Sequence, residues 1–332
     1  MWTRLREPVH QDTSVLLAGR QFHEKPQERP VLSATVAPWR LWVVFTLTAA
    51  TAQTFRNAAQ RSLIDSLGTV GATHVRFVFG LPFGLVFLFS VGLAAGDLPQ
   101  LTLSSIGWTA LGAVSQIAAT ALMLAAMRER SFVVTTAYIK TEPVQVAIFA
   151  TVILGEHVTP MLAVAIVVAT VGVLALSWPS RAGKEIFSWR PALFGIAAGA
   201  LFALAAISFR GGITALGTSA FVPVATVTLV VSLSIQTVLL SAWLWWRKPE
   251  TMRAIFGSWR VSIPAGFLGA FASEMWFLAF AIQNPARVRT LALVEIVIAG
   301  LVSRRLFAQT PTLRDIAGMA LVAAGIALLF NG

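Results

Sequence analysis

The sequence predicts an all-α integral membrane protein with ten transmembrane helices, arranged as two inverted five-helix repeats. Three observations support this prediction. The composition is too apolar for a chain surrounded by water, ten stretches are long and apolar enough to cross a bilayer, and the two halves of the chain share a residue pattern.

The composition places the chain in lipid. Of 332 residues, 57% are hydrophobic and only 12% are charged, whereas about a quarter of the residues in an ordinary soluble domain are charged. The 25 basic and 14 acidic residues give a net charge of +11. Because the basic residues lie mainly in the N-terminal tail and between apolar stretches, they indicate membrane topology and not nucleic-acid binding.

A helix needs about 20 mostly apolar residues to cross the hydrocarbon core of a bilayer. Ten stretches meet this requirement. They are residues 39–60, 70–95, 103–127, 132–154, 159–178, 190–210, 220–246, 261–282, 286–307 and 312–331. Pro82 and Pro143 lie inside two of these stretches, and we expect them to kink their helices because proline lacks a backbone N–H.

The two halves of the chain repeat. Phe55-Arg56 closes the first span and Phe209-Arg210 closes the sixth, while Glu142 in the fourth span corresponds to Glu295 in the ninth. Five spans per half is an odd number, so the second half must run through the membrane in the opposite direction. The predicted parts are a disordered basic tail (1–38), a first repeat (39–178), a linker (179–189) and a second repeat (190–332).

Several short motifs resemble a known family. They are Arg76-Phe77 at the start of the second span, "TEPV" at 141–144, "LGE" at 154–156 and the glycine-containing fifth span "VVATVGVLAL". In these motifs the chain resembles the drug/metabolite transporter superfamily, specifically its ten-span EamA type. The second half departs from the pattern, because Ile296 follows Glu295 where proline is expected and Gln309 stands where the first half has Glu156.

Ionisable side chains inside the spans are the candidates for function, because each one costs about 2.5–3.5 kcal/mol to insert at the bilayer centre. The residues predicted to bind substrate or a proton are Glu142, Glu295, Tyr138, Gln145, Glu274 and Trp276. The residues predicted to have a gating or structural role are Arg56, Arg210, Lys140 and Pro143.

Alternative interpretations accompany these candidates. Glu142 and Glu295 either bind substrate or a proton, or stabilise broken helix ends without touching substrate. On a continuous helix, Tyr138, Glu142 and Gln145 form one polar stripe, which we expect to face a cavity. Lys140 points away from that stripe, so we expect it to snorkel or to meet a partner on another span. Arg56 and Arg210 lie near helix ends, where snorkelling to headgroups is the default.

Enzyme and metal chemistry have little support in the sequence. Cysteine is absent and the four histidines lie far apart, which disfavours a metal site. We find no nucleophile motif, no H-E-x-x-H motif and no phosphate-binding loop. We therefore expect a protein that is not an enzyme and that has no cofactor.

The resemblance implies a secondary transporter, in particular an exporter of small metabolites such as amino acids or drug-like amphiphiles, in a bacterial inner membrane. Protons or a counter-substrate would supply the energy, and the protein would be a monomer or a homodimer. The alternative is a lipid-handling or scaffold membrane protein of the same fold. The count of basic residues, nine on the N-terminal side against fourteen on the other, favours both termini outside, whereas the resemblance implies both inside.

Overall fold

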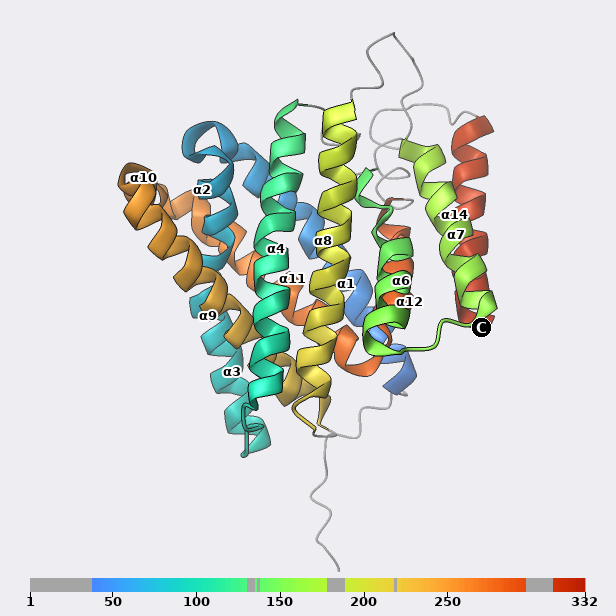
Figure 1. The fold of residues 1–332 in the computed structure, drawn as a ribbon, viewed down its shortest axis with the longest axis horizontal. Helices are drawn as coiled ribbons and strands as arrows, with labels where there is room; N and C mark the ends of the chain where they lie inside the picture. Colours follow the sequence, from blue (N-terminus) through green and yellow to red (C-terminus); the bar gives the residue numbers. More distant parts are fainter. Residues whose placement is uncertain are drawn as a thin grey trace, which may run out of the picture. The chain divides into compact units, whose positions relative to one another are not determined.

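The computed structural model describes residues 38–129, 135, 138–177, 189–217, 220–296 and 313–331, all of them within the unit Ala37–Gly332. Regular structure in these residues is helical, with no strand (Figure 1). The predicted all-α class is therefore confirmed. The tail 1–37, most of the linker 179–189 and Gln309 lie outside the described residues.

Twelve helices have their bounds defined. In the first half they are α1 (Pro38–Ser62), α2 (Ile64–Val78), α3 (Leu81–Ala95), α4 (Leu103–Glu129), α6 (Glu142–Leu154) and α7 (Pro160–Ser177). In the second half they are α8 (Trp189–Thr214), α9 (Phe221–Arg247), α10 (Pro249–Gly257), α11 (Trp259–Ile282), α12 (Pro285–Leu291) and α14 (Leu313–Asn331).

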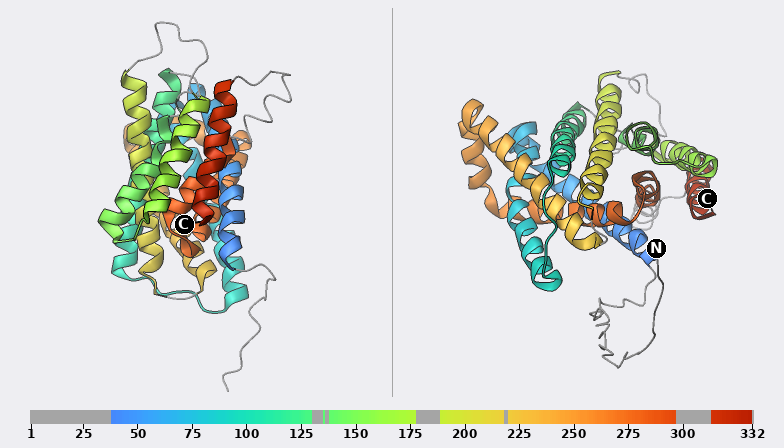
Figure 2. Two further views of the ribbon diagram at one scale, coloured as in Figure 1. Left: turned by 90° about the vertical axis from the view of Figure 1, so that its right-hand side faces the viewer. Right: turned by 60° about the horizontal axis from the view of Figure 1, so that its bottom comes forward.

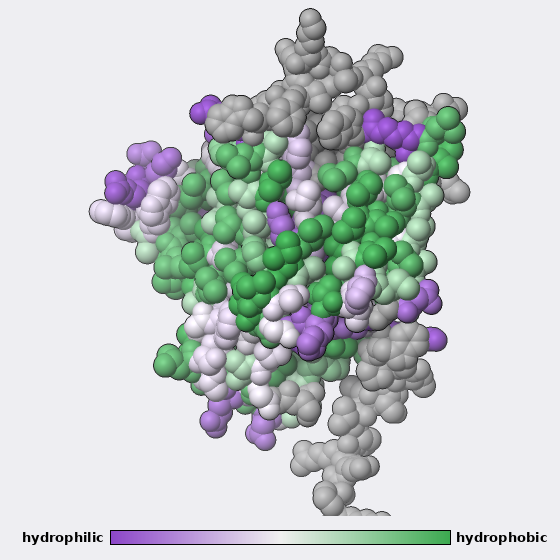
Figure 3. Space-filling model, turned by 45° about the vertical axis from the view of Figure 1, so that its right-hand side comes forward, coloured by the Kyte–Doolittle hydropathy of each residue, from purple (hydrophilic) through white to green (hydrophobic). Residues whose placement is uncertain are grey.

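Five helical segments within the described ranges are long and apolar enough to cross a membrane. They are Ile64–Ala95, Leu103–Arg128, Ala192–Thr214, Phe221–Arg247 and Trp259–Ile282. Three further apolar helices, α6, α7 and α14, are shorter. Large hydrophobic side chains such as Phe89, Val152 and Leu93 are exposed, and Figure 3 shows a broad hydrophobic area on one face, with hydrophilic residues toward its edges. These features are typical of a multi-pass membrane protein; the count of ten spans stays a prediction.

Small residues bring the helices together. The most extensive contacts join α4 to α8, α7 to α14 and α1 to α11, and Figures 1 and 2 show α7 beside α14. A Cβ atom on Gly172 of α7 would lie only 2.7 Å from the backbone nitrogen of Val322 in α14, and one on Gly325 would lie 2.7 Å from the backbone nitrogen of Ala169. Glycine is required at both positions because larger side chains would separate the two backbones.

The predicted fourth and ninth spans are both interrupted. In the fourth, a turn at Lys140-Thr141 precedes α6, which begins at Glu142 with Pro143 in its first turn. In the ninth, α12 ends at Leu291, a turn follows, and helical residues resume at Val294. Both carboxylates therefore lie directly after a helix break.

Two expectations about helices need correction. Pro82 and Pro143 do not kink continuous helices but lie in the first turns of α3 and α6, where the missing N–H leaves no intrahelical bond unmade. A further helix, α10, was not predicted from the sequence; it has nine residues, of which only Met252 and Ile255 are buried. It is too short and too polar to stand out as an apolar span.

Candidate functional site

Two ion pairs cross between the halves of the chain at the helix breaks. Lys140 of the first half pairs with Glu295 of the second. Glu142 of the first half pairs with Arg289 of the second, the Arg289 Nε atom lying 3.1 Å from Oε1 without the alignment of a hydrogen bond. Each of these four charges thus faces an opposite charge from the other half of the chain, which offsets part of the cost of burying it.

Polar side chains from α1 and α11 surround these pairs. Thr54 donates a hydrogen bond of 3.4 Å to Glu295 Oε2. The Arg289 guanidinium lies 4.1 Å from the centre of the Trp276 ring, a cation–π contact. The Trp276 Nε1–H donates to Gln53 Oε1 at 3.0 Å. The ion pairs therefore lie where the residues around α1, α6, α11 and α12 converge.

The predicted polar stripe on the fourth span is wrong as a single stripe, because the turn at Lys140-Thr141 separates Tyr138 from Glu142. Tyr138 packs against Gly195 of α8, where a Cβ atom would lie 2.5 Å from the Tyr138 Cβ. Gln145 Nε2 donates to the Ile196 carbonyl at 3.4 Å. Tyr138 and Gln145 therefore contact α8, while Glu142 contacts Arg289.

Glu274 occupies a separate buried position on α11. Its side chain is almost completely buried, and Oε1 accepts a hydrogen bond of 2.5 Å from Thr226 on α9. Its second oxygen has no hydrogen-bond partner among the described residues. This carboxyl group therefore does not belong to the crossed ion pairs.

The arginines at the helix ends differ from the expectation of snorkelling. Arg56 is only 1% exposed, and its Nη2 and Nε atoms donate to Asn57 Oδ1 at 2.7 and 3.2 Å. Arg210 contacts Glu156 at 3.3 Å and donates to the Phe280 and Ala281 carbonyls at 2.6 and 3.1 Å. Arg210 thus caps the C-terminal end of α11, where free carbonyl groups favour a cation.

Two further arginines are buried although they are not among the residues predicted to have a function. Arg289, which enters the sequence-based prediction only as one of the basic residues that indicate topology, is 8% exposed and pairs with Glu142. Arg76 had been read only as part of a family motif, yet it is 1% exposed and donates to Thr120 Oγ1 at 3.4 Å and Ser273 Oγ at 3.1 Å. Each of these arginines lies inside an apolar stretch of the sequence. The same feature identifies Glu142, Glu274 and Glu295 as candidates, and it could have identified the arginines too.

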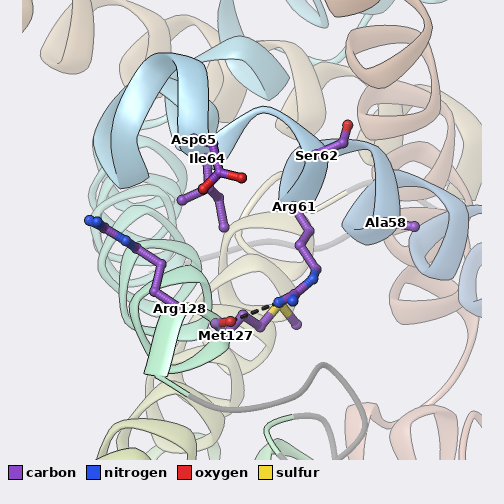
Figure 4. Close-up of a pocket in the computed structure, with 7 residues that line it drawn as sticks. All are labelled: Ala58, Arg61, Ser62, Ile64, Asp65, Met127 and Arg128. Carbon is purple, nitrogen blue, oxygen red and sulfur yellow. Dashed lines mark hydrogen bonds between the residues drawn. The ribbon is translucent and has the colours of Figure 1, made fainter.

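Three of the pockets lined by described residues bear on the site. One of them, of about 600 Å³, lies between the end of α1, the start of α2 and the end of α4 (Figure 4). The others are lined by α2, α4 and α9 or by α1 and α11. None of the three is lined by a residue predicted to bind substrate, so the predicted central cavity stays a prediction. The part of the chain that is described also holds no cluster of potential metal ligands.

Comparisons with known proteins agree with the arrangement of helices. A model of the EamA-like transporter family matches residues 40–178. No curated protein matches the chain. A solved structure described as "Crystal structure of protein" matches with a TM-score of 0.63 and 15% sequence identity, covering 86% of this chain and 94% of that one. At this identity the likeness shows the fold alone.

Proposed function

We propose that this chain is a secondary transporter that carries small metabolites by alternating access. The match of residues 40–178 to a model of the EamA-like transporter family supports this proposal. We propose a bacterial inner membrane as its location, export as its direction, and amino acids or drug-like amphiphiles as its substrates. The bilayer surrounds it, and protons or a counter-substrate supply the energy.

The observation that carries the proposal is the pair of crossed ion pairs at two broken helices. Discontinuous helices in the two repeats of a transporter commonly form its substrate and ion sites. Here Glu142 and Glu295 occupy such breaks in the fourth and ninth predicted spans, and each pairs with a cation from the other half. Movement of one half against the other must separate or rehydrate these pairs.

The helix packing supports an inverted repeat of 39–178 and 190–331. Exchanging the halves turns the contact of α1 with α11 into that of α8 with α4. The contacts of α3 with α9 and of α7 with α14 each map onto themselves. A twofold relation of this kind allows the two halves to exchange roles between outward-open and inward-open states.

A proton or a substrate would act on the ion pairs. A proton on Glu142 or Glu295 neutralises one partner and weakens its attraction to Arg289 or Lys140. A charged substrate competes with one partner directly. Either event favours separation of the halves, and its reversal favours closure, which couples binding to the change of state.

The test is transport by purified protein in liposomes. Counterflow of labelled amino acids, polyamines and sugars identifies the substrate class. Glu142→Gln keeps the shape of the side chain but cannot release a proton. We therefore expect it to abolish gradient-driven uptake at two pH values while substrate exchange continues. Glu295→Gln should have the smaller effect on gradient-driven uptake, because Glu295 is not followed by a proline as Glu142 is.

Glu250→Gln, on the exposed surface of α10, is the matched control and should transport normally. If both Glu142→Gln and Glu295→Gln retain full pH-driven transport, these carboxylates do not couple a proton. If the protein moves no solute but relocates labelled lipid between leaflets, the lipid-handling alternative replaces the transporter.

A further inference from the structure

Arg56 and Arg76 are buried, and neither forms an ion pair with a carboxylate of the described residues. Each side chain is only 1% exposed. The ion pairs found among the described residues are Lys140 with Glu295, Arg210 with Glu156 and Arg289 with Glu142. Arg56 and Arg76 take part in none of them, so this region of the protein interior carries an excess of positive charge.

The two arginines meet on one face of α11. Gly269, Ser273 and Trp276 lie at positions i, i+4 and i+7 and so share a face of the helix. A Cβ atom on Gly269 would lie 2.8 Å from Arg76 Cγ and 3.6 Å from Arg56 Cδ. Ser273 accepts from Arg76, and Trp276 lies under Arg289. Arg56 is close enough to Arg76 and Arg289 to be repelled by both, and Glu295, which forms its ion pair with Lys140, also attracts it.

Both guanidinium groups retain unused donors. Arg56 Nη1 and Arg76 Nε have no hydrogen-bond partner in the described part of the chain. The bonds that the two groups do make go to neutral oxygens of Asn57, Thr120 and Ser273. Glu274 follows Ser273 directly in the sequence, but its carboxylate accepts from Thr226 instead. A buried charge without a counterion is strongly destabilising, and an anionic ligand would remove this penalty.

We propose that Arg56 and Arg76 bind the anionic group, a carboxylate or a phosphate, of the transported metabolite. The guanidinium group suits this role because its planar array of donors matches carboxylate and phosphate oxygens and never loses its charge. This inference rests on the proposed transport function. It adds that the substrate carries an anionic group. The crossed ion pairs keep their proposed role of responding to substrate binding.

The pocket in Figure 4 lies toward the same end of α1 as Arg56, although neither Arg56 nor Arg76 lines it. It lies at the end of α1, where Arg61 is five residues beyond Arg56, about 7.5 Å along a helix. Arg61 and Arg128 line it together with one carboxylate, Asp65. A net positive pocket raises the local concentration of anions and favours their entry.

Binding by the purified full-length protein in neutral detergent tests the proposal. The probes are succinate, inorganic phosphate and putrescine, a diamine with the same four-carbon length as succinate. We expect succinate or phosphate to raise the melting temperature in a saturable way, because a ligand that binds the folded state stabilises it. Putrescine should not. Stabilisation by putrescine alone, or by none of the three, overturns the proposal.

Variants assign the effect to the two arginines. Arg56→Gln and Arg76→Gln should each weaken apparent anion affinity by about tenfold or more, the usual loss when a charged hydrogen-bonding partner is removed. Arg253→Gln, exposed on α10, is the matched control. If a glutamine variant does not fold, Arg56→Lys and Arg76→Lys keep the charge and should bind with intermediate affinity. Equal affinity in the site variants and the control overturns the proposal.

Two further outcomes separate this inference from the proposed function. If liposomes show counterflow only of solutes that have no carboxylate or phosphate group, such as polyamines or sugars, transport stands and the anion site is wrong. If the anions bind through Arg56 and Arg76 but no solute moves, the site stands and the transport function is wrong. Stabilisation by phosphatidylglycerol without any response to succinate or phosphate assigns the arginines to a lipid headgroup and overturns the proposal.

Discussion

At the scale of single residues, buried charge is the dominant feature of this protein. Lys140, Glu142, Arg289 and Glu295 form two ion pairs that link the halves of the chain. Replacing a well-packed buried ion pair as a whole is often tolerated, whereas removing one partner leaves an uncompensated charge inside the protein. The four residues should therefore behave as pairs and not as independent sites.

A double-mutant cycle measures this coupling. We expect Glu142→Gln and Arg289→Gln each to lower stability, and the double variant to lose less than the sum of the two. The coupling should amount to about 1–3 kcal/mol, as for other residues in direct contact. Melting temperatures and denaturant titrations of the purified variants provide the measurement. Strictly additive effects would show that the pair contributes no interaction energy.

At the scale of helices, two features shape the fold: breaks within spans and close packing of small residues. The turn at Lys140-Thr141 frees backbone groups next to Glu142, and Glu142 then lies in the first turn of α6. A carboxylate is favourable there because the first turn of a helix exposes unpaired N–H groups. The α7–α14 pair depends instead on glycine, with Gly172 and Gly325 each facing the other backbone.

The packing of α7 on α14 predicts the effect of a substitution. Gly172→Val would place atoms less than 3 Å from the α14 backbone, so the two helices must separate. We expect a loss of about 1–3 kcal/mol, typical of overpacking, measured as a lower melting temperature. Gly107→Val is the matched control, since a Cβ atom on Gly107 meets nothing within 4 Å. Equal losses in both variants would point to glycine replacement in general and not to this contact.

At the scale of the whole molecule, the proposed inverted repeat makes a prediction about topology. The chain has no cysteine, so single introduced cysteines can be labelled without background. Asp97 and His157 should lie on one side of the membrane, and Arg128 and Glu250 on the other, because an odd number of predicted spans separates the two groups. All four are exposed.

A membrane-impermeant maleimide applied to intact cells provides the measurement. We expect the cysteines at positions 97 and 157 to be either both labelled or both protected. The cysteines at positions 128 and 250 should then show the other result. Labelling of positions 97 and 128 from the same side would contradict ten spans. The same experiment also identifies which side holds the N terminus, where the charge count and the family resemblance disagree.

The sequence by itself determined the properties that depend on composition and local pattern. Apolar stretches identified the membrane class and the approximate course of most helices, because lipid restricts the residue types along each spanning segment. The repeated pattern of the two halves singled out Glu142 and Glu295. Only the tertiary structure decided the partners. Contacts between segments far apart in the chain bring Arg289 to Glu142 and Arg76 to Ser273 and bury Arg56 inside the protein. No local sequence pattern specifies such contacts.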